Sequence, residues 1–388
     1  MVGIVLLGIF VLLLAFGAPI AVCLGMSSVG AILVQGAGKP LDAIMSVLPR
    51  LCSSASSKFV LLAIPFFILS GNVMEKAGIS GRLINLAEKC LGHIRGGMAM
   101  VCVVVSCFFA AISGSGPATV AALGLIMIPA LVKAGYPASF SCALMAAGGA
   151  IGVVIPPSIT FVVYGSIADA SITDLFISGV IPGLMMGAGL IVAALILGRR
   201  MDLKVMPRAS AQERFKAFKD AFWGLLMPVI ILGGIMSGKF SPTEAAAVAT
   251  AYALVIGLFV YHELDLKGIW EAFVNAAKST GQILIIVALA SLFSWVITVA
   301  QIPQTVSAML QDNIHSKVAM LMVINIILLI AGTFIDTTSA IVIFAPLFIP
   351  ICKAMNVDLV HFGMIMTVNL TIGMCTPPLG VCLFVSSS

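Results

Sequence analysis

The sequence has 388 residues, of which 61% are hydrophobic and only 9% are charged, with a formal net charge of +5. So few polar side chains cannot cover a soluble surface, and apolar runs near the ~20 residues that span a bilayer recur along the chain. The composition therefore excludes a soluble domain and indicates a polytopic protein embedded in the lipid bilayer. The modest charge does not point to a nucleic-acid partner. The nine cysteines form no CxxC pair, so neither a disulfide framework nor a Cys/His metal site is supported.

The first half begins with two expected spans, 3–17 and 19–35, followed by an interfacial helix. In Pro40–Ser53, apolar residues at helical spacing oppose Asp42 and Arg50, which is typical of a helix lying in the membrane interface. Residues 59–91 are interrupted at Pro65 and at Ser70-Gly71-Asn72. This pattern favours a re-entrant helical hairpin, with one Pro-kinked span as the alternative.

A break rich in glycine and proline, Ser113–Pro117, interrupts the apolar run of 97–133. Unpaired backbone groups are costly in hydrocarbon, so such a break is tolerable only where the freed groups face a cavity or a bound solute. The next expected span, 139–164, has a second break at 152–158. Two breaks on adjacent helices predict that both line one cavity.

The second half repeats this pattern. The ungapped shift that places Gly152 on Gly373 also places Pro156-Pro157 on Pro377-Pro378, and brings the first broken helix onto a second one in 331–353. Short broken helices at matching places in two halves indicate the midplane site of a secondary transporter.

The other elements of the second half keep the same order. The expected elements are spans at 222–237 and 243–261, an amphipathic stretch at 264–278, a hairpin at 281–310 with its tip near 288–295, a broken helix at 318–353 and a broken span at 359–385. Because each half crosses an even number of times, the lone span at 175–198 starts the second half on the opposite side. We therefore expect an all-α fold of two inverted repeats with re-entrant hairpins and discontinuous helices.

These elements suggest a division into a fixed part and a moving part. The first repeat with the linking span is 1–198, a basic linker is 199–221, and the second repeat is 222–388. Within them we expect a scaffold at 1–58 and 222–280, a transport core at 59–165 and 281–388, and the linking span at 175–198. The density of Lys and Arg in the linker favours a cytoplasmic position for it, with the N-terminus outside.

A helix break exposes free N–H groups on one side and free carbonyls on the other. The N–H end attracts a carboxylate, and carbonyl oxygens suit a hard cation such as Na⁺. Hydroxyl groups beside both breaks support the hypothesis of a site for an anion and Na⁺. For any single hydroxyl, a hydrogen bond to its own helix backbone stays the alternative. The candidate substrate-binding residues are Ser113, Ser115, Gly116, Pro117, Thr119, Thr337, Thr338 and Ser339.

Two acidic residues need separate interpretation. Asp336 lies inside the second break, and its role as a Na⁺ ligand or proton carrier stays open beside that of an N-cap for the helix beginning near Thr338. Glu244 follows Ser241-Pro242 in the pattern of a capping box and is assigned a structural role. The sequence lacks GxSxG, HExxH and a complete P-loop, so an enzyme is not expected.

Four separated motifs, at 111–119, 152–158, 240–247 and 368–380, resemble the large membrane (M) subunit of tripartite ATP-independent periplasmic (TRAP) transporters. The resemblance implies a Na⁺-coupled, elevator-type importer of the bacterial inner membrane for an organic acid such as sialic acid or a C4-dicarboxylate. It also implies two partners, a small membrane subunit of the Q type and a soluble periplasmic substrate-binding protein of the P type. Carried over by motif, the Na⁺ sites involve Ser113, Gly114, Gly152 and Pro156 in the first half, and Gly332, Asp336, Gly373 and Thr376 in the second.

Two other functions are compatible with the same features. A stand-alone sodium/dicarboxylate symporter would have the same inverted architecture but would not depend on a soluble binding protein. A passive anion channel would not accumulate its solute against a gradient.

Overall fold

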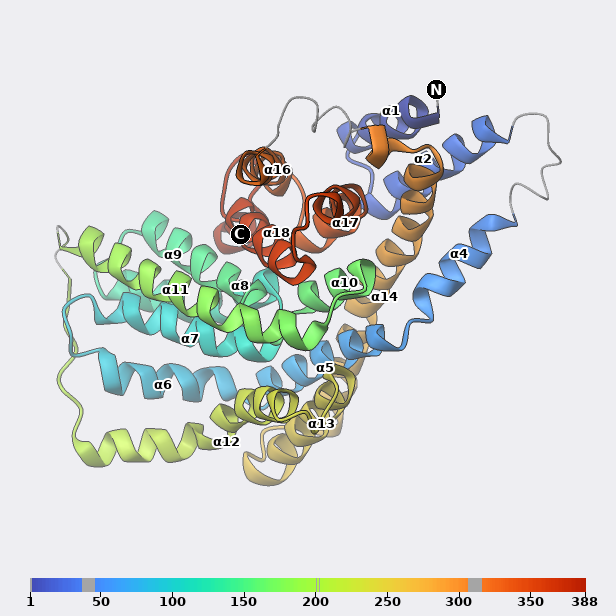
Figure 1. Ribbon diagram of the computed structural model, residues 1–388. Coiled ribbons are helices and arrows are strands. Elements are labelled where there is room, and N and C mark those ends of the chain that lie inside the picture. Colours follow the sequence, from blue (N-terminus) through green and yellow to red (C-terminus); the bar gives the residue numbers. More distant parts are fainter. Residues whose placement is uncertain (1, 37–45, 200, 202, 306–315) are drawn as a thin grey trace.

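The computed structural model describes residues 2–36, 46–199, 201, 203–305 and 316–388. Within these ranges all regular secondary structure is helical (Figure 1), which confirms the expected all-α class. Seven of the described helical segments are long and apolar enough to cross a membrane, and several shorter apolar helices accompany them. The fold is therefore that of a polytopic membrane protein.

The helices of the first half largely follow the expected spans. They are α1 (Val2–Ala15), α2 (Ile20–Gln35), α4 (Val47–Ser56), the short η1 (Phe59–Leu62), α5 (Ala63–Lys76), α6 (Ile79–Leu91), α7 (Gly97–Ser113), α8 (Gly116–Lys133), α9 (Ala138–Ala150), η2 (Ile151–Val153), α10 (Ile159–Ala168) and α11 (Ile172–Gly198). The first part of the expected interfacial helix, Pro40–Met45, lies outside the described residues. The remainder, α4, has no buried side chain and packs against a later helix, α14.

The second half contains the longest of the described helices. They are α12 (Ala211–Met236), α13 (Pro242–Val255), the π-helical turn η3 (Ile256–Val260), α14 (Leu266–Val299), α16 (Lys317–Gly332), α17 (Thr337–Ala354), α18 (Leu359–Gly373) and α19 (Val381–Ser387). Helix α12 begins inside the expected basic linker, where Ser210 and Glu213 form a capping box. The predicted capping box of Ser241 and Glu244 is confirmed at the start of α13.

The first expected hairpin, at 59–91, is placed wrongly by the sequence. Residues 63–76 form one continuous helix through both predicted interruptions, and the chain turns only at Gly78, which has φ +70°. Pro65 is tolerated because it lies in the first turn, where its missing N–H has no intrahelical partner. Gly71 serves close packing, since a Cβ there would lie 3.2 Å from Cα of Ser113.

The second expected hairpin, at 281–310, is also absent over its described part. Residues 266–299 form one helix, α14, which includes both the expected amphipathic stretch and the expected tip at 288–295. No glycine or proline lies between Gly281 and Gln301, and the hydroxyl of Ser291 donates to the carbonyl of Ala288 in its own helix. Without a residue that disfavours helix, α14 continues; residues 306–310 lie outside the described residues.

The re-entrant hairpins occur instead at the two breaks that were expected to be discontinuous helices. Met145 of α9 contacts Cys102 of α7 (3.9 Å between sulfurs) and also lies beside Gly124 of α8. In a straight helix Cys102 and Gly124 would be about 30 Å apart. Helices α7 and α8 therefore fold back on each other as a first hairpin, whose tip is Ser113–Gly116.

Helices α16 and α17 form the second hairpin in the same way. Lys317, the first residue of α16, donates from Nζ to the carbonyl of Asn356, just beyond α17, at 2.8 Å. The two helices are seen end-on beside each other in Figure 1. Their tip is Thr333–Asp336.

Each of two further breaks separates two half-helices, of which one packs on the first hairpin and the other on the second. Helix α9 packs on α8 of the first hairpin, whereas α10 packs on α17 of the second. Conversely, α18 packs on the second hairpin, whereas α19 packs on α8 and α9. The chain between the half-helices contains a cis bond in both copies, Pro156-Pro157 and Pro377-Pro378. This reciprocal packing confirms the repeated fold with hairpins and discontinuous spans.

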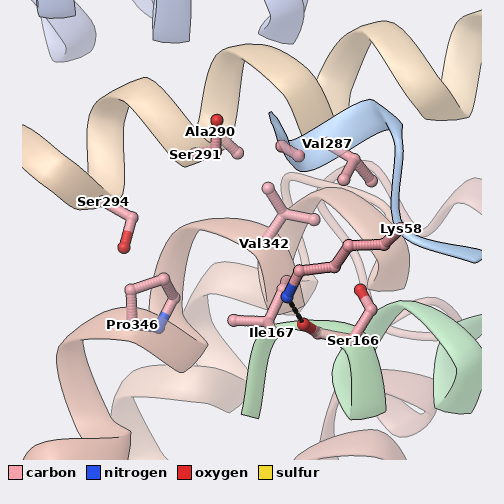
Figure 2. Close-up of a pocket in the computed structure, with 10 residues that line it drawn as sticks. Lys58, Ser166, Ile167, Val287, Ala290, Ser291, Ser294, Val342 and Pro346 are labelled. Carbon is pink, nitrogen blue, oxygen red and sulfur yellow. Dashed lines mark hydrogen bonds between the residues drawn. The ribbon is translucent and has the colours of Figure 1, made fainter. Parts of the chain in front are cut away.

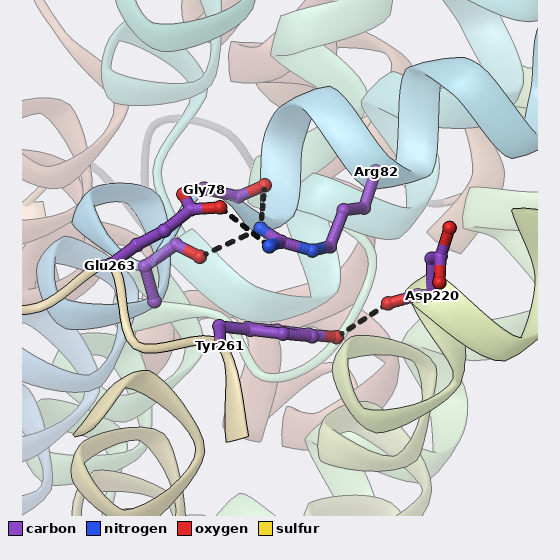
Figure 3. A network of polar contacts seen from close by, with 6 residues as sticks. Gly78, Arg82, Asp220, Tyr261 and Glu263 are labelled. Atoms are coloured by element: carbon purple, nitrogen blue, oxygen red, sulfur yellow. Dashed lines mark hydrogen bonds and ion pairs between the residues drawn. The ribbon is translucent and has the colours of Figure 1, made fainter. Parts of the chain in front are cut away.

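A polar cluster joins the turn after α5 and the first turns of α6 to the chain that follows η3 (Figure 3). Arg82 pairs with Glu263 at 2.5 Å and donates to the carbonyls of Ala77 and Gly78. Its guanidinium also lies 3.9 Å from the centroid of the Tyr261 ring. One side chain thus ties the first half of the protein to the second.

We expect Arg82→Ala to lower the midpoint of thermal unfolding in detergent by a few degrees. The half-exposed ion pair contributes little, but the stacking and carbonyl bonds bring the loss to about 1–2 kcal/mol. Arg95→Ala, at an exposed position, is the matched control and should unfold like the unmodified chain. Equal midpoints for both variants would contradict this role.

Candidate functional site at the hairpin tips

The first tip is a compact cluster of hydroxyls and backbone. The Ser113 hydroxyl lies 2.7 Å from that of Thr119, and Thr119 also donates to the carbonyl of Ser115. Gly114 has φ +63° and accepts at its carbonyl from the N–H of Ile159, so the tip is fastened to the start of α10. A Cβ on Gly152 would lie 3.3 Å from the Thr119 hydroxyl. Most of the predicted first site is therefore brought together.

Pro156 is the exception among the predicted first-site residues. It lines an apolar groove on the far side of α7 with Cys107 and Ala111, and no described contact joins it to the hydroxyl cluster. Pro117 occupies the second position of α8, where proline is well tolerated.

The second tip is built from glycine and backbone contacts. Gly332 and Gly373 touch so closely that a Cβ on Gly373 would lie 2.7 Å from the Gly332 backbone. The Thr333 carbonyl accepts from the N–H groups of Leu379 and Gly380, which fastens this tip to the second Pro-Pro loop. Thr376, in the loop after α18, donates to the carbonyl of Ile372, so its hydroxyl proton is used by the last turn of α18.

The remaining predicted residues of the second site surround the start of α17. The Asp336 carboxylate accepts from the N–H of Ser339 at 3.0 Å, so the N-cap role left open by the sequence is confirmed. The Thr337 hydroxyl donates to the sulfur of Met374, and Thr338 is half-buried. The Ser339 hydroxyl is fully buried and has no hydrogen-bond partner among the described residues.

Met374 connects the two tips. Its sulfur lies 2.6 Å from the Thr337 hydroxyl, and its methyl group would lie 2.8 Å from a Cβ on Gly116. Met374 therefore brings the start of α8 and the start of α17 next to each other.

The two hairpins differ at the start of their second helix. At α17 the Asp336 side chain caps the free N–H groups and supplies a negative charge. At α8 the N-cap is Ser115, whose side chain makes no capping bond. The positive end of the helix dipole is thus neutralised at the second tip and available at the first.

A cavity of about 110 Å³ opens beside the first tip. Its walls come from α5, the first hairpin, α10 and α14, and its lining residues are Ile68, Gly71, Asn72, Glu75, Phe109, Ser113, Ser115, Ala118, Ile159, Ser279 and Ile283. Ser115 and Ala118 belong to the cap and first turn of α8, so the uncapped helix end faces this cavity. The geometry suits a small anion.

Sequence reasoning missed Asn72, Glu75, Ser279 and Met374. A signal existed for the first two, because Asn72 and Glu75 are polar residues three apart in an apolar run and share one face of a helix. Asn72 was instead interpreted as part of an interruption of the helix. Ser279 and Met374 have no local pattern that distinguishes them from ordinary membrane-helix residues.

A second cavity, of about 170 Å³, lies farther along α14 and is shown in Figure 2. Val287, Ser291 and Ser294 line it, and they continue the α14 face that carries Ser279 and Ile283. Lys58 reaches across it to the carbonyl of Ser166 and lies 3.6 Å from Asp169. Both cavities thus lie between the hairpin core and the same face of α14.

A family model described as the DctM component of the tripartite ATP-independent periplasmic transporters matches residues 7–388. The chain belongs to this family. The resemblance drawn from the sequence motifs is therefore confirmed.

Relatives within the family differ in their named substrates. The chain is 44% identical over 384 residues to the "Isethionate TRAP transporter permease protein DctMQ" of Oleidesulfovibrio alaskensis, covering 99% of this chain and 60% of that protein. It is 45% identical over 347 residues to the "C4-dicarboxylate TRAP transporter large permease protein DctM" of Pseudomonas aeruginosa, covering 89% of this chain and 81% of the relative. The sialic acid permease SiaM of Vibrio cholerae is 39% identical, over 85% of this chain and 77% of that protein.

A solved structure shares the fold. The Alcanivorax borkumensis YdaH transporter, described as having an unusual topology, aligns with a TM-score of 0.60 at 16% identity, covering 89% of this chain and 81% of that one. At this identity the likeness supports the architecture alone.

Proposed function

We propose that the protein is the large permease of a Na⁺-coupled TRAP importer for a small organic anion in the bacterial inner membrane. The observation that carries this proposal is the uncapped N-terminus of α8, which faces the cavity beside Ser113 and Ser115. A carboxylate or sulfonate there accepts hydrogen bonds from backbone N–H groups and from the Ser115 hydroxyl. Isethionate, C4-dicarboxylates and sialic acid, the substrates for which the relatives are named, all carry such a group.

The residues of the second tip fit a sodium ion. Asp336 has no Lys, Arg or His within ion-pair distance among the described residues, and the buried Ser339 hydroxyl beside it has no partner. Na⁺ would balance the carboxylate and accept oxygen ligands from Asp336, Thr376 and the backbone near Gly332 and Gly373. Its role is to couple anion uptake to the sodium gradient. At the first tip, Ser113, Gly114 and Gly152 offer the equivalent oxygens.

The moving part in this proposal differs from the division expected from the sequence. Helix α5 packs mainly on α13 and α14, and α14 packs on α2 and α5. We therefore assign both helices to the fixed frame, and assign α7–α10 and α16–α19 to an elevator core. The continuous face of α14, which borders both cavities, is the surface along which this core would move.

Two partners follow from the tripartite family, a small membrane subunit and a periplasmic binding protein. The chain spans about 60% of the DctMQ relative, whose name joins the M and Q components. We propose that a Q-type subunit packs against the frame and that a P-type protein delivers the anion. In this proposal the protein transports its substrate and catalyses no covalent reaction.

Reconstitution tests this function. We expect uptake of a labelled organic anion such as isethionate into proteoliposomes only when the chain, a Q-type subunit and a loaded P-type protein are combined under an inward Na⁺ gradient. A sodium ionophore should abolish the accumulation. Sodium-driven uptake by the chain alone would indicate a stand-alone symporter, and equilibration without a gradient would indicate a channel.

A further inference from the structure

The cavity at the first tip has an unusual charge for an anion site. Glu75, from α5, is the one charged residue among those that line it, and no Lys or Arg borders it in the described part of the chain. Neighbouring Lys76 is engaged elsewhere, since its ammonium pairs with Glu271 at 2.6 Å. Among the described residues that line the cavity, only those at the start of α8 supply positive potential.

We propose that Glu75 determines specificity by admitting organic acids with a single anionic group and a hydroxyl-bearing remainder. The proposal rests on the proposed function, in which the anion binds at the start of α8. An ionised carboxylate only accepts hydrogen bonds, so Glu75 can receive a substrate hydroxyl but repels a second carboxylate.

The surroundings of Glu75 support the same selection. Asn72 and Ser279 add neutral polar groups to the cavity wall, and both can bond to hydroxyls. The second tip offers no alternative place for a second carboxylate, because Asp336 already occupies the start of α17. A dicarboxylate in this cavity would thus meet one favourable helix end and the negative side chain of Glu75.

A matched pair of ligands tests the proposal. 4-Hydroxybutyrate and succinate have the same carbon chain, and they differ in that one carboxylate is replaced by a hydroxymethyl group. Protection of the purified permease from thermal unfolding, titrated with each ligand in NaCl, measures binding without the specificity of a binding protein. We expect 4-hydroxybutyrate to bind about ten- to a hundredfold more tightly, from charge repulsion at short range in a partly hydrated site.

Variants of Glu75 separate charge from shape. Glu75→Gln should bring the two ligands to within about threefold, whereas Glu75→Asp should keep the preference. Glu88→Gln removes the same charge from α6, outside the cavity, and should leave the preference unchanged.

Three outcomes would overturn the proposal. The first two are equal binding of both ligands by the unmodified chain, or an unchanged preference in Glu75→Gln; either refutes the role of Glu75 and leaves the proposed anion site intact. The third, protection by neither ligand, refutes the anion site and this inference with it.

Discussion

Transport is expected to fail in Gly373→Ala while the smaller perturbation Gly332→Ala leaves part of it. A Cβ at 373 would lie 2.7 Å from both Cα and the carbonyl carbon of Gly332, whereas a Cβ at 332 would meet Gly373 at 3.3 Å. The first distance is too short for any carbon pair, and both neighbours are backbone, so the second tip must separate from the Pro-Pro loop. Such overpacking costs about 1–3 kcal/mol and displaces proposed sodium ligands.

Measured uptake in proteoliposomes should therefore rank the glycine variants by clearance. Gly281→Ala, inside α14 with no atom within 4 Å of its added Cβ, is the control and should transport like the unmodified chain. Size-exclusion profiles and unfolding midpoints establish that each variant folds. Full uptake by Gly373→Ala would show that the two glycine backbones need not touch.

The reason for the glycine at 373 differs from the one that sequence suggests. A left-handed backbone is a common explanation of an important glycine, but positive φ occurs at Gly114 and Gly380 and not at Gly373. Gly373 is required by close approach of another backbone. Only the folded arrangement shows which of these two physical causes applies.

The places where helices end at the two tips were predictable, but the direction of the chain afterwards was not. Gly114 and Pro117 indicate from the local sequence that the helix is interrupted there. Whether the next helix runs straight on or folds back depends on which neighbours bury its apolar face, here α9 through Met145. That information is non-local, so a straight broken helix and a hairpin have the same sequence pattern.

At the two wrongly predicted hairpins, the sequence pattern indicates a break where the helix in fact continues. Around Gly71, small and polar residues resemble a break, yet glycine there allows α5 to approach Ser113. Along α14, Ser291 and Ser294 resemble a polar tip, yet they face a cavity on one side of a continuous helix. Composition identifies special positions without saying whether they serve a turn or a close contact.

Asp336→Asn is expected to raise the Na⁺ concentration for half-maximal uptake by about ten- to a hundredfold, the equivalent of losing one charged oxygen ligand. Asparagine caps helices about as well as aspartate, so the bond to the Ser339 N–H and the start of α17 should survive. The substitution therefore removes the charge while keeping the cap. Asp336→Ala removes both, and should add a loss of about 1 kcal/mol in stability to the same sodium effect.

Asp358→Asn provides the matched control. Asp358 caps α18 by accepting from the N–H of His361 at 2.9 Å, at the exposed end of that helix and away from both tips. It should keep the sodium dependence of the unmodified chain, as measured by uptake over a Na⁺ titration. If Asp336→Asn behaves like Asp358→Asn and only Asp336→Ala is impaired, Asp336 is a helix cap alone. The sodium site would then have to be sought among the hydroxyl and backbone oxygens of the first tip.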